Sequence, residues 1–161
     1  MITQAELKNL FYYDPITGIF IWRLTRQGVN IGQPAGSINS DGYRIICVDG
    51  RYYTAGRLAW LWMKGKWPER DIDHIDTDPS NNRWNNLRLA TISQNAGNRK
   101  KAKNNTSGFK GVCMATCGRW VARICINGRR FHLGYFDTAA NAHKAYVAAA
   151  EKYFGEFARA A

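Results

Sequence analysis

The segment spanning residues 71–98 places the tightest limits on what this chain can fold into. It predicts four short elements in succession, a strand, a polar loop, a second strand and a helix, the first three over residues 72–75, 76–86 and 87–90. Thr91 and Ser93 are both suitable N-caps for the helix, whose first turn holds Asn95. This order of elements can bring Asp73 and His74, on the first strand, against the start of the helix. The segment therefore predicts a small unit in which these polar side chains share one site.

These polar residues have the chemistry needed to hydrolyse a phosphodiester. The carboxylate of Asp73 and the amide oxygen of Asn95 are hard oxygen ligands, which suit Mg²⁺ or Mn²⁺ better than zinc. The imidazole of His74 can take a proton from water near neutral pH, and Asn86 could hold the ring in a useful orientation. An isolated Asp-His pair is more often a chance surface pair or a structural hydrogen bond than a catalytic site. Its occurrence together with two amides at these spacings favours the catalytic interpretation.

The whole chain has a formal net charge of +11 and a pI near 9.8, and its basic residues gather in one part of the sequence. Between Pro79 and Phe136 the sequence contains no Asp or Glu. The basic residues of that stretch are Arg83, Arg88, Arg99, Lys100, Lys101, Lys103, Lys110, Arg119, Arg123, Arg129 and Arg130. Such complete exclusion of acids favours a polyanionic partner, with nucleic acid as the first candidate, over a basic surface that only faces solvent.

The sequence contains neither a signal-peptide pattern nor an apolar run long enough to span a membrane. We therefore expect a cytoplasmic protein with no membrane association. No obligate protein partner is inferred. The cysteines lack the paired Cys-x-x-Cys spacing of a zinc site, so we interpret them as reduced thiols rather than metal ligands. They are Cys47, Cys113, Cys117 and Cys125.

Residues 1–70 predict an α/β lead-in to the central unit. A short helix over residues 5–11 precedes a turn at residues 14–18, in which proline and glycine occupy favourable positions. Residues 19–22 are apolar, β-branched or aromatic, and predict a strand. Asp49-Gly50 is a strong signal for a two-residue hairpin between two further strands. A buried helix is then expected to end at Gly65.

The end of the chain predicts a second, smaller domain after a basic, polar linker at residues 99–107. Three strands are expected, over residues 109–116, 119–126 and 130–135. Asn127-Gly128 is the expected hairpin turn between the last two. Asp137 or Thr138 can cap a helix that runs to Tyr153 or Phe154. One face of this helix is expected to consist of Ala142, Ala145, Tyr146, Ala149 and Tyr153. The predicted class is α+β, with domains at residues 1–98 and 108–161.

The central segment resembles the HNH endonucleases, in particular the H-N-N variety found among phage and intron-encoded homing enzymes. The matching core motifs are Asp73-His74, Asn86-Leu87 and Gln94-Asn95, and the loop between the strands contains Asn81-Asn82-Arg83. The match extends upstream to Arg57-Leu58-Ala59-Trp60 and Gly65-Lys66-Trp67-Pro68. The resemblance implies a ββα-metal site. Asp73 and Asn95 would bind one divalent ion, Mg²⁺ or Mn²⁺, His74 would be the general base and Asn86 would orient it. Relatives of this kind commonly have histidine before the Arg-Leu pair, where this chain has Gly56.

The last part of the chain resembles the AP2 domain, a three-stranded sheet packed on one helix that reads DNA with the sheet. The matching pieces are residues 108–112, 118–124, 133–136 and 142–150. Alternation independently places Arg119 and Arg123 on one face of the second strand, and it places on the other face Trp120, Ala122, Ile124 and Ile126. Cys113 and Ala115 stand where the family usually carries arginines. The resemblance implies DNA contacts by Lys110, Arg119, Arg123 and Arg130, and the linker residues expected to add to them are Arg99, Lys100 and Lys101.

These features together predict a site-specific, metal-dependent endonuclease of homing type that binds double-stranded DNA and nicks it. Two alternatives stay open. One is a non-catalytic DNA-binding regulator that retains a decayed HNH fold, which Gly56 motivates. The other is an RNA-binding protein. Mg²⁺-dependent relaxation of a supercoiled plasmid tests the first alternative, and competition between DNA and RNA tests the second.

Overall fold

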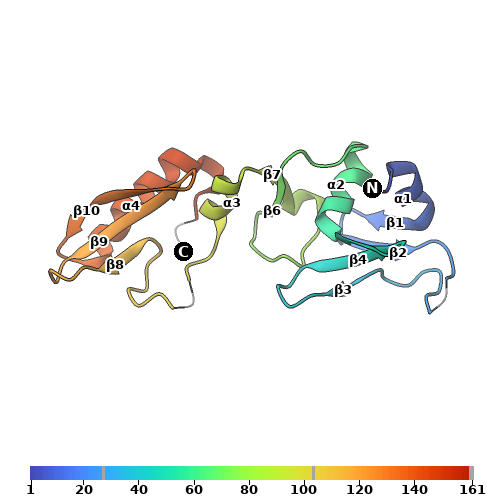
Figure 1. Cartoon of the computed structure of the whole chain (residues 1–161), viewed down its shortest axis with the longest axis horizontal. Coiled ribbons are helices and arrows are strands. Elements are labelled where there is room, and N and C mark those ends of the chain that lie inside the picture. The colour runs from blue at the N-terminus through green and yellow to red at the C-terminus, as the bar shows by residue number, and fades with distance from the viewer. Residues whose placement is uncertain (27, 103, 160–161) are drawn as a thin grey trace. The chain divides into compact units, whose positions relative to one another are not determined.

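The computed structural model of the chain describes residues 1–26, 28–102 and 104–159 (Figure 1). Strands follow one another in runs that are separated by helices, which is consistent with the predicted α+β class. The chain divides into two compact units, Met1–Leu89 and Ala90–Ala161, called the first and the second unit below. Within the described ranges, none of the helices is long and apolar enough to cross a membrane.

The first unit begins with a helix that runs directly into a hairpin. Helix α1 (Gln4–Leu10) starts at Thr3 with a reciprocal capping box. Strand β1 (Phe11–Asp14) follows at once and pairs antiparallel with β2 (Ile19–Trp22). The carboxylate of Asp14 accepts hydrogen bonds from two residues of the intervening turn, at 2.9 and 2.7 Å. The predicted turn and following strand are confirmed, whereas the predicted helix ends one residue early because its last residue opens β1.

A three-stranded antiparallel sheet follows, with β4 between its two neighbours. Its strands are β3 (Ser37–Ile38), β4 (Arg44–Val48) and β5 (Arg51–Thr54). Asp49 and Gly50 connect β4 to β5 with φ of 49° and 76°, the left-handed backbone that a two-residue hairpin of this kind requires. Helix α2 (Ala55–Lys64) leads on from β5 and ends at Gly65, as predicted.

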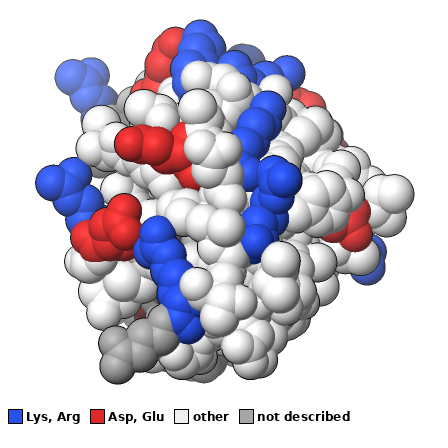
Figure 2. All heavy atoms as spheres, turned by 90° about the vertical axis from the view of Figure 1, so that its right-hand side faces the viewer, with Lys and Arg blue, Asp and Glu red and all other residues white. Residues whose placement is uncertain are grey.

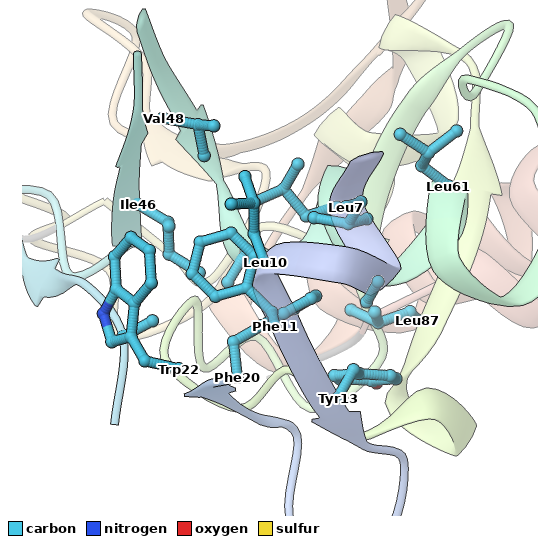
Figure 3. Close-up of a cluster of buried hydrophobic side chains, with 14 residues drawn as sticks. Leu7, Leu10, Phe11, Tyr13, Phe20, Trp22, Ile46, Val48, Leu61 and Leu87 are labelled. Atoms are coloured by element: carbon cyan, nitrogen blue, oxygen red, sulfur yellow. The ribbon is translucent and has the colours of Figure 1, made fainter. Parts of the chain in front are cut away.

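The core of the first unit lies between α1, α2, the β1–β2 hairpin and β4 (Figure 3). The rings of Phe11 and Phe20 pack edge to face, with centroids 6.0 Å apart, and Trp22 lies 4.3 Å from Phe11. Leu7 and Ile46 are fully buried beside them. Full burial of each such side chain contributes about 1.5–3 kcal/mol. The core therefore fixes the hairpin and α2, which in turn support the loop described below.

The predicted order of strand, loop, strand and helix is present in the central segment. Strands β6 (Asp71–His74) and β7 (Leu87–Ala90) form a two-stranded sheet, and the loop between them ends in a short 3₁₀ helix, η1 (Trp84–Asn86). Helix α3 (Ile92–Asn98) is capped by Thr91, one of the two expected caps. Strand β7 reaches the boundary between the two compact units, and α3 belongs to the second.

The second unit contains the predicted three-stranded antiparallel sheet on one helix, with β9 in the centre. Helix α4 (Ala139–Phe154) packs against all three strands and is capped by Thr138. A second short 3₁₀ helix, η2 (Gly155–Phe157), directly follows α4. The strands are β8 (Val112–Met114), β9 (Trp120–Ile126) and β10 (Arg129–Phe136).

The buried face of α4 differs from the prediction in its last turn. Tyr153, expected on that face, is 51% exposed, and Phe154 is buried in its place. The buried residues follow a strict four-residue spacing, as Ala142, Tyr146, Ala150 and Phe154. The predicted face was wrong at Tyr153 because each four-residue step advances about 40° around the helix, so by the last turn the buried stripe has moved past Tyr153 to Phe154.

Candidate functional site

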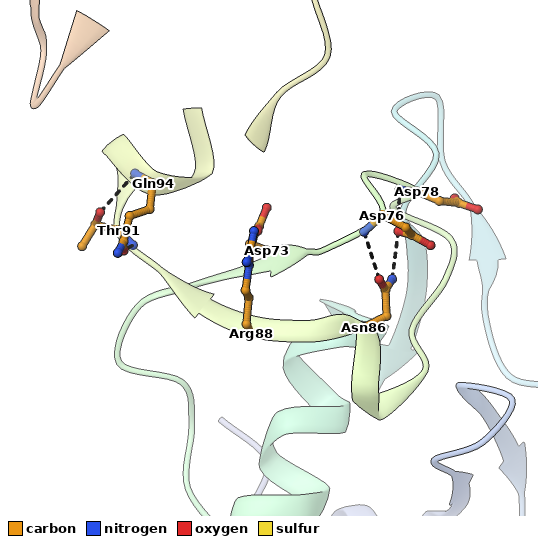
Figure 4. A network of polar contacts seen from close by, with 7 residues as sticks. All are labelled: Asp73, Asp76, Asp78, Asn86, Arg88, Thr91 and Gln94. Carbon is orange, nitrogen blue, oxygen red and sulfur yellow. Dashed lines mark hydrogen bonds and ion pairs between the residues drawn. The ribbon is translucent and has the colours of Figure 1, made fainter. Parts of the chain in front are cut away.

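Asp73 and His74 end strand β6, and their exposed fractions are only 4% and 7%. Arg88, on the neighbouring strand β7, donates a hydrogen bond from Nε to Oδ2 of Asp73 at 2.8 Å (Figure 4). A buried carboxylate needs such compensation because its transfer out of water is costly. No sequence motif predicts this role for Arg88. The only signal available was its place on the strand predicted to lie beside β6.

The imidazole of His74 faces the loop that joins β6 to β7. Its Nε2 lies 3.2 Å from Oδ1 of Asn82, which is itself 2% exposed. The ring of Tyr43 approaches edge-on, with a centroid distance of 5.9 Å. Asn82 had entered the sequence analysis only as part of the loop motif, without a function. The structure places it directly beside the predicted base.

Asn86, predicted to orient His74, holds the loop and the backbone next to the histidine. Its Nδ2 donates to Oδ1 of Asp76 at 2.9 Å (Figure 4). The same Nδ2 donates to the main-chain oxygen of Asn81 at 2.8 Å. Its Oδ1 accepts from the N–H of Asp76 at 3.0 Å. The main-chain oxygen of Asn86 also accepts from the N–H of Ile75 at 2.9 Å. Asn86 therefore fixes the residue that immediately follows His74.

Two acids of the same loop, Asp76 and Asp78, are stabilised in their ionised form. Partial burial works to raise the pKa of Asp76, but hydrogen bonds from the N–H of Asp78 and the amides of Asn81 and Asn86 outweigh it and lower the pKa. The hydroxyl and N–H of Ser80 lower the pKa of Asp78. Because both pKa values are lowered in the folded state, these contacts stabilise the fold at neutral pH. That contribution is lost as the pH falls below about 4, the ordinary value for Asp.

Asn86→Ala should lower the free energy of unfolding by about 1–3 kcal/mol, because it removes the three hydrogen bonds that this buried amide makes to the loop. Urea unfolding of the full chain measures this loss. Asn85→Ala is the matched control, since Asn85 is the exposed neighbour in η1 and its replacement should change stability by no more than about 0.5 kcal/mol. Equal unfolding midpoints for the two variants would show that Asn86 does not hold the loop.

Asn95 lies in the first turn of α3, in the second unit. The start of this helix is fixed by a capping box, in which Oγ1 of Thr91 accepts from the N–H of Gln94 at 3.2 Å (Figure 4). In return, Oε1 of Gln94 accepts from the N–H of Thr91 at 2.9 Å. The N–H of Asn95 donates to the carbonyl of Thr91. Asp73 belongs to the first unit, so the joint role of Asp73 and Asn95 as metal ligands stays a prediction.

The donor chemistry of these two residues fits a hard divalent ion. Among the described residues there is no cluster of three or more His, Cys, Asp or Glu side chains suited to a metal. A magnesium site of one or two carboxylates or amides does not need such a cluster, because Mg²⁺ keeps several waters and takes further oxygens from a substrate phosphate. The carboxylate of Asp73 and the amide oxygen of Asn95 are ligands of that kind, and Mg²⁺ or Mn²⁺ would suit them.

The side of the β8–β10 sheet that α4 does not cover carries basic and aromatic side chains. We define this basic face by its exposed residues Arg119, Arg123, Arg130, His132 and Tyr135. Arg123 lies opposite His132 in the strand pairing. The rings of His132 and Tyr135 are 4.8 Å apart, because an irregularity in β10 between them allows both to lie on one face. As predicted for β9, Arg123 is exposed between the buried Ala122 and Ile124, whereas Val121, two residues before Arg123, is also buried.

Lys110, predicted as a DNA contact, makes a contact inside the second unit. Its Nζ donates to the carbonyl of Gly97, near the end of α3, at 2.6 Å. Burial lowers the pKa of Lys110 to about 8, with a smaller contribution from the positive charge of Arg159. The sequence could not indicate this contact, because it joins two segments on either side of the predicted linker.

The other predicted DNA contacts are exposed. Arg119 donates to Oδ1 of Asp137 at 3.2 Å, an exposed ion pair of the kind that contributes little to stability. In the predicted linker, Arg99 and Lys100 are exposed, and Nζ of the exposed Lys101 donates to a carbonyl at 2.9 Å. Their roles toward DNA remain predictions.

The positive charge of the chain is concentrated in the second unit. Of the 23 Lys and Arg residues, 12 lie after residue 89, together with only 3 of the 12 Asp and Glu residues. The first unit is nearly balanced, with 11 basic and 9 acidic residues. Figure 2 shows the right-hand side of the molecule in Figure 1, where basic side chains are interspersed with acidic ones. The long-range attraction for a polyanion therefore comes mainly from the second unit.

The sequence matches two family models, and these define the class of the protein. The model of the HNH endonuclease matches residues 53–97, and the model of the AP2 domain matches residues 107–156. The first match includes the predicted residues Asp73, His74, Asn86 and Asn95. The chain belongs to the HNH endonuclease family and carries an AP2 domain, and both domains indicate DNA binding.

Two relatives of viral origin share long stretches with this chain. An uncharacterized HNH endonuclease of Acanthamoeba polyphaga mimivirus is 32% identical over 145 residues, which cover 89% of this chain and 68% of the relative. Protein 3.8 of Escherichia phage T7 is 42% identical over 66 residues, which cover 38% of this chain and 54% of the phage protein. No solved structure matches the chain.

Proposed function

We propose that the protein is a site-specific, metal-dependent DNA endonuclease of homing type that nicks one strand of the duplex. The observation that supports this most is the buried Asp73-His74 pair at the end of β6, with Arg88 on the carboxylate and Asn82 on the imidazole. Reacting groups held by packing and by hydrogen-bonded neighbours keep the orientation that a hydrolytic reaction needs.

In the proposed reaction, His74 takes a proton from a water molecule, and the water oxygen attacks the phosphorus atom in line with the 3′-oxygen. The bond from phosphorus to the 3′-oxygen then breaks, and the leaving oxygen takes a proton from solvent water, which leaves a 5′-phosphate and a 3′-hydroxyl. Asn86 keeps the backbone after His74 in place during this step. A divalent ion, which Asp73 and Asn95 would hold, supplies charge neutralisation at the phosphate and the leaving oxygen.

The second unit provides the affinity for DNA under this proposal. Its excess of basic residues favours the phosphate backbone, and such contacts make binding strong but salt-dependent. The basic face offers arginines that can reach the base edges in the major groove, where a guanidinium pairs well with guanine. Cleavage chemistry and DNA recognition would thus reside in different parts of the chain.

Relaxation of a supercoiled plasmid tests the proposal. With Mg²⁺ or Mn²⁺, the purified full-length protein should convert supercoiled DNA to the nicked circle, and sequencing of the ends should locate a preferred site. Linear product as the first species would contradict nicking. DNA binding without cleavage in either ion would support the alternative of a non-catalytic regulator.

Asp73→Ala should raise the Mg²⁺ concentration needed for half-maximal nicking by about 10-fold or more, because it removes one of the proposed ligands. Asn95→Asp should retain part of the activity, since it replaces an amide oxygen by a charged oxygen. Asp41→Ala removes an exposed carboxylate elsewhere in the first unit and should leave the Mg²⁺ requirement unchanged. Nicking that continues in excess EDTA would rule out the metal-dependent reaction.

A further inference from the structure

We propose that Asn82 is a positioning residue that fixes the tautomer and the orientation of His74, a role that rests on the proposed function of His74 as the base. Nε2 of His74 and Oδ1 of Asn82 are 3.2 Å apart, and both residues are buried. Asn82 follows His74 by eight residues and comes from the polar loop, not from a strand or helix. The contact therefore depends on how the whole loop is held.

The hydrogen-bond pattern of the Asn82 amide determines which of its ends faces His74. Nδ2 of Asn82 donates to the main-chain oxygen of Ser80 at 3.0 Å, so Oδ1 is the atom turned toward the imidazole. An amide oxygen can only accept a hydrogen bond, so Nε2 of His74 must carry the hydrogen. A neutral imidazole carries a single ring hydrogen, which leaves the lone pair on Nδ1. Nδ1 is then the atom that takes the proton from the attacking water.

The N-terminal hairpin holds Asn82 in this position. The hydroxyl of Tyr13, on β1, donates to the main-chain oxygen of Asn82 at 2.7 Å in a buried contact. The turn after β1 also packs directly on the loop, since a Cβ added to Gly18 would lie 2.4 Å from the carbonyl carbon of Asn82 and 2.4 Å from the N of Arg83. The hairpin lies outside the residues that match the HNH endonuclease model. It would nevertheless control the geometry of the base.

Gly56, on α2, leaves room for the same amide. A Cβ at this position would lie 3.2 Å from Oδ1 of Asn82 and 3.3 Å from the side chain of Ile72. Both distances are tighter than ordinary van der Waals contact, so a side chain at position 56 would press on the oxygen that faces His74. The glycine that motivated the decayed-fold alternative is thus compatible with a functional arrangement of Asn82.

Single-turnover nicking of plasmid at saturating protein tests the role of Asn82. Asn82→Ala should lower the rate constant by about 10- to 100-fold with little change in DNA affinity, because the ring is no longer held in its reactive orientation. Asn82→Asp retains an acceptor at the same place and should recover most of the rate. Asn85→Ala, which changes an exposed residue of the same loop, should nick at the wild-type rate. An Asn82→Ala variant as fast as the wild type would overturn the proposal.

NMR of the ¹⁵N-histidine-labelled full-length protein provides a readout that does not depend on activity or on an added metal. The chain has 3 histidines, and His74→Ala identifies the signal of interest. The neutral His74 ring of the wild type should show a protected Hε2 proton, which Asn82→Ala should lose and Asn82→Asp should keep. A ring proton on Nδ1 in the wild type would overturn the inference. A wild type that does not nick would contradict the proposed function, and the ring signal would then decide the tautomer alone.

Discussion

His74→Ala should lower the rate of Mg²⁺-dependent nicking by about 10²–10⁴-fold, while the affinity for DNA stays nearly unchanged. The reason is that the imidazole handles a proton and is not expected to hold the duplex. It is 7% exposed and lies against Asn82, within the nearly charge-balanced first unit. Single-turnover rates and binding titrations on the same DNA measure the two quantities separately.

The fold of this variant must be checked, because the change leaves the buried oxygen of Asn82 without its donor. We expect the free energy of unfolding to fall by about 1–3 kcal/mol, which urea unfolding can measure. A variant that is folded, binds DNA and cleaves as fast as the wild type would exclude His74 as the base. A variant that loses binding and cleavage together would indicate that His74 holds the DNA or the fold instead.

The local elements of this protein could be predicted from the sequence because their signals are local. Asp49-Gly50 and Asn127-Gly128 both form the expected hairpin turns, with positive φ at each residue. Thr91 begins α3 because its hydroxyl accepts a hydrogen bond from the first turn, and Gly65 ends α2 because its backbone adopts a left-handed conformation. In each case the residues that carry the signal are within one turn of the feature they specify.

The contacts of the candidate site could be predicted only in part. The sequence motifs predict roles for Asp73, His74 and Asn86, but they do not pair Asn82 with His74, because the loop is positioned by Tyr13, 69 residues earlier in the chain. No pattern of neighbouring residues carries information about a contact of that range. The same reason applies to Lys110, whose ammonium joins the carbonyl of Gly97 across a predicted linker.

Arg123→Ala, in the centre of the basic face, should weaken DNA binding by about 1–3 kcal/mol, or roughly 5- to 150-fold, if the guanidinium reads a base edge. Arg123 is exposed on the central strand, and it lies opposite His132 in the strand pairing. Adding Arg130→Ala should increase the loss, approximately additively if the two side chains contact separate positions of the duplex. Binding titrations at several salt concentrations, with specific and random duplexes, measure the effect.

The salt dependence distinguishes the two ways in which Arg123 could contact DNA. A base contact predicts a loss confined to the preferred sequence, with relaxed preference at one position. A phosphate contact predicts an equal loss on all duplexes and a salt slope reduced by about one unit. Lys144→Ala is the matched control, because it removes one positive charge from an exposed position of α4, which packs against the opposite side of the sheet. If Arg123→Ala and Lys144→Ala bind with equal affinity and equal salt slope, the basic face is not the surface that anchors the DNA.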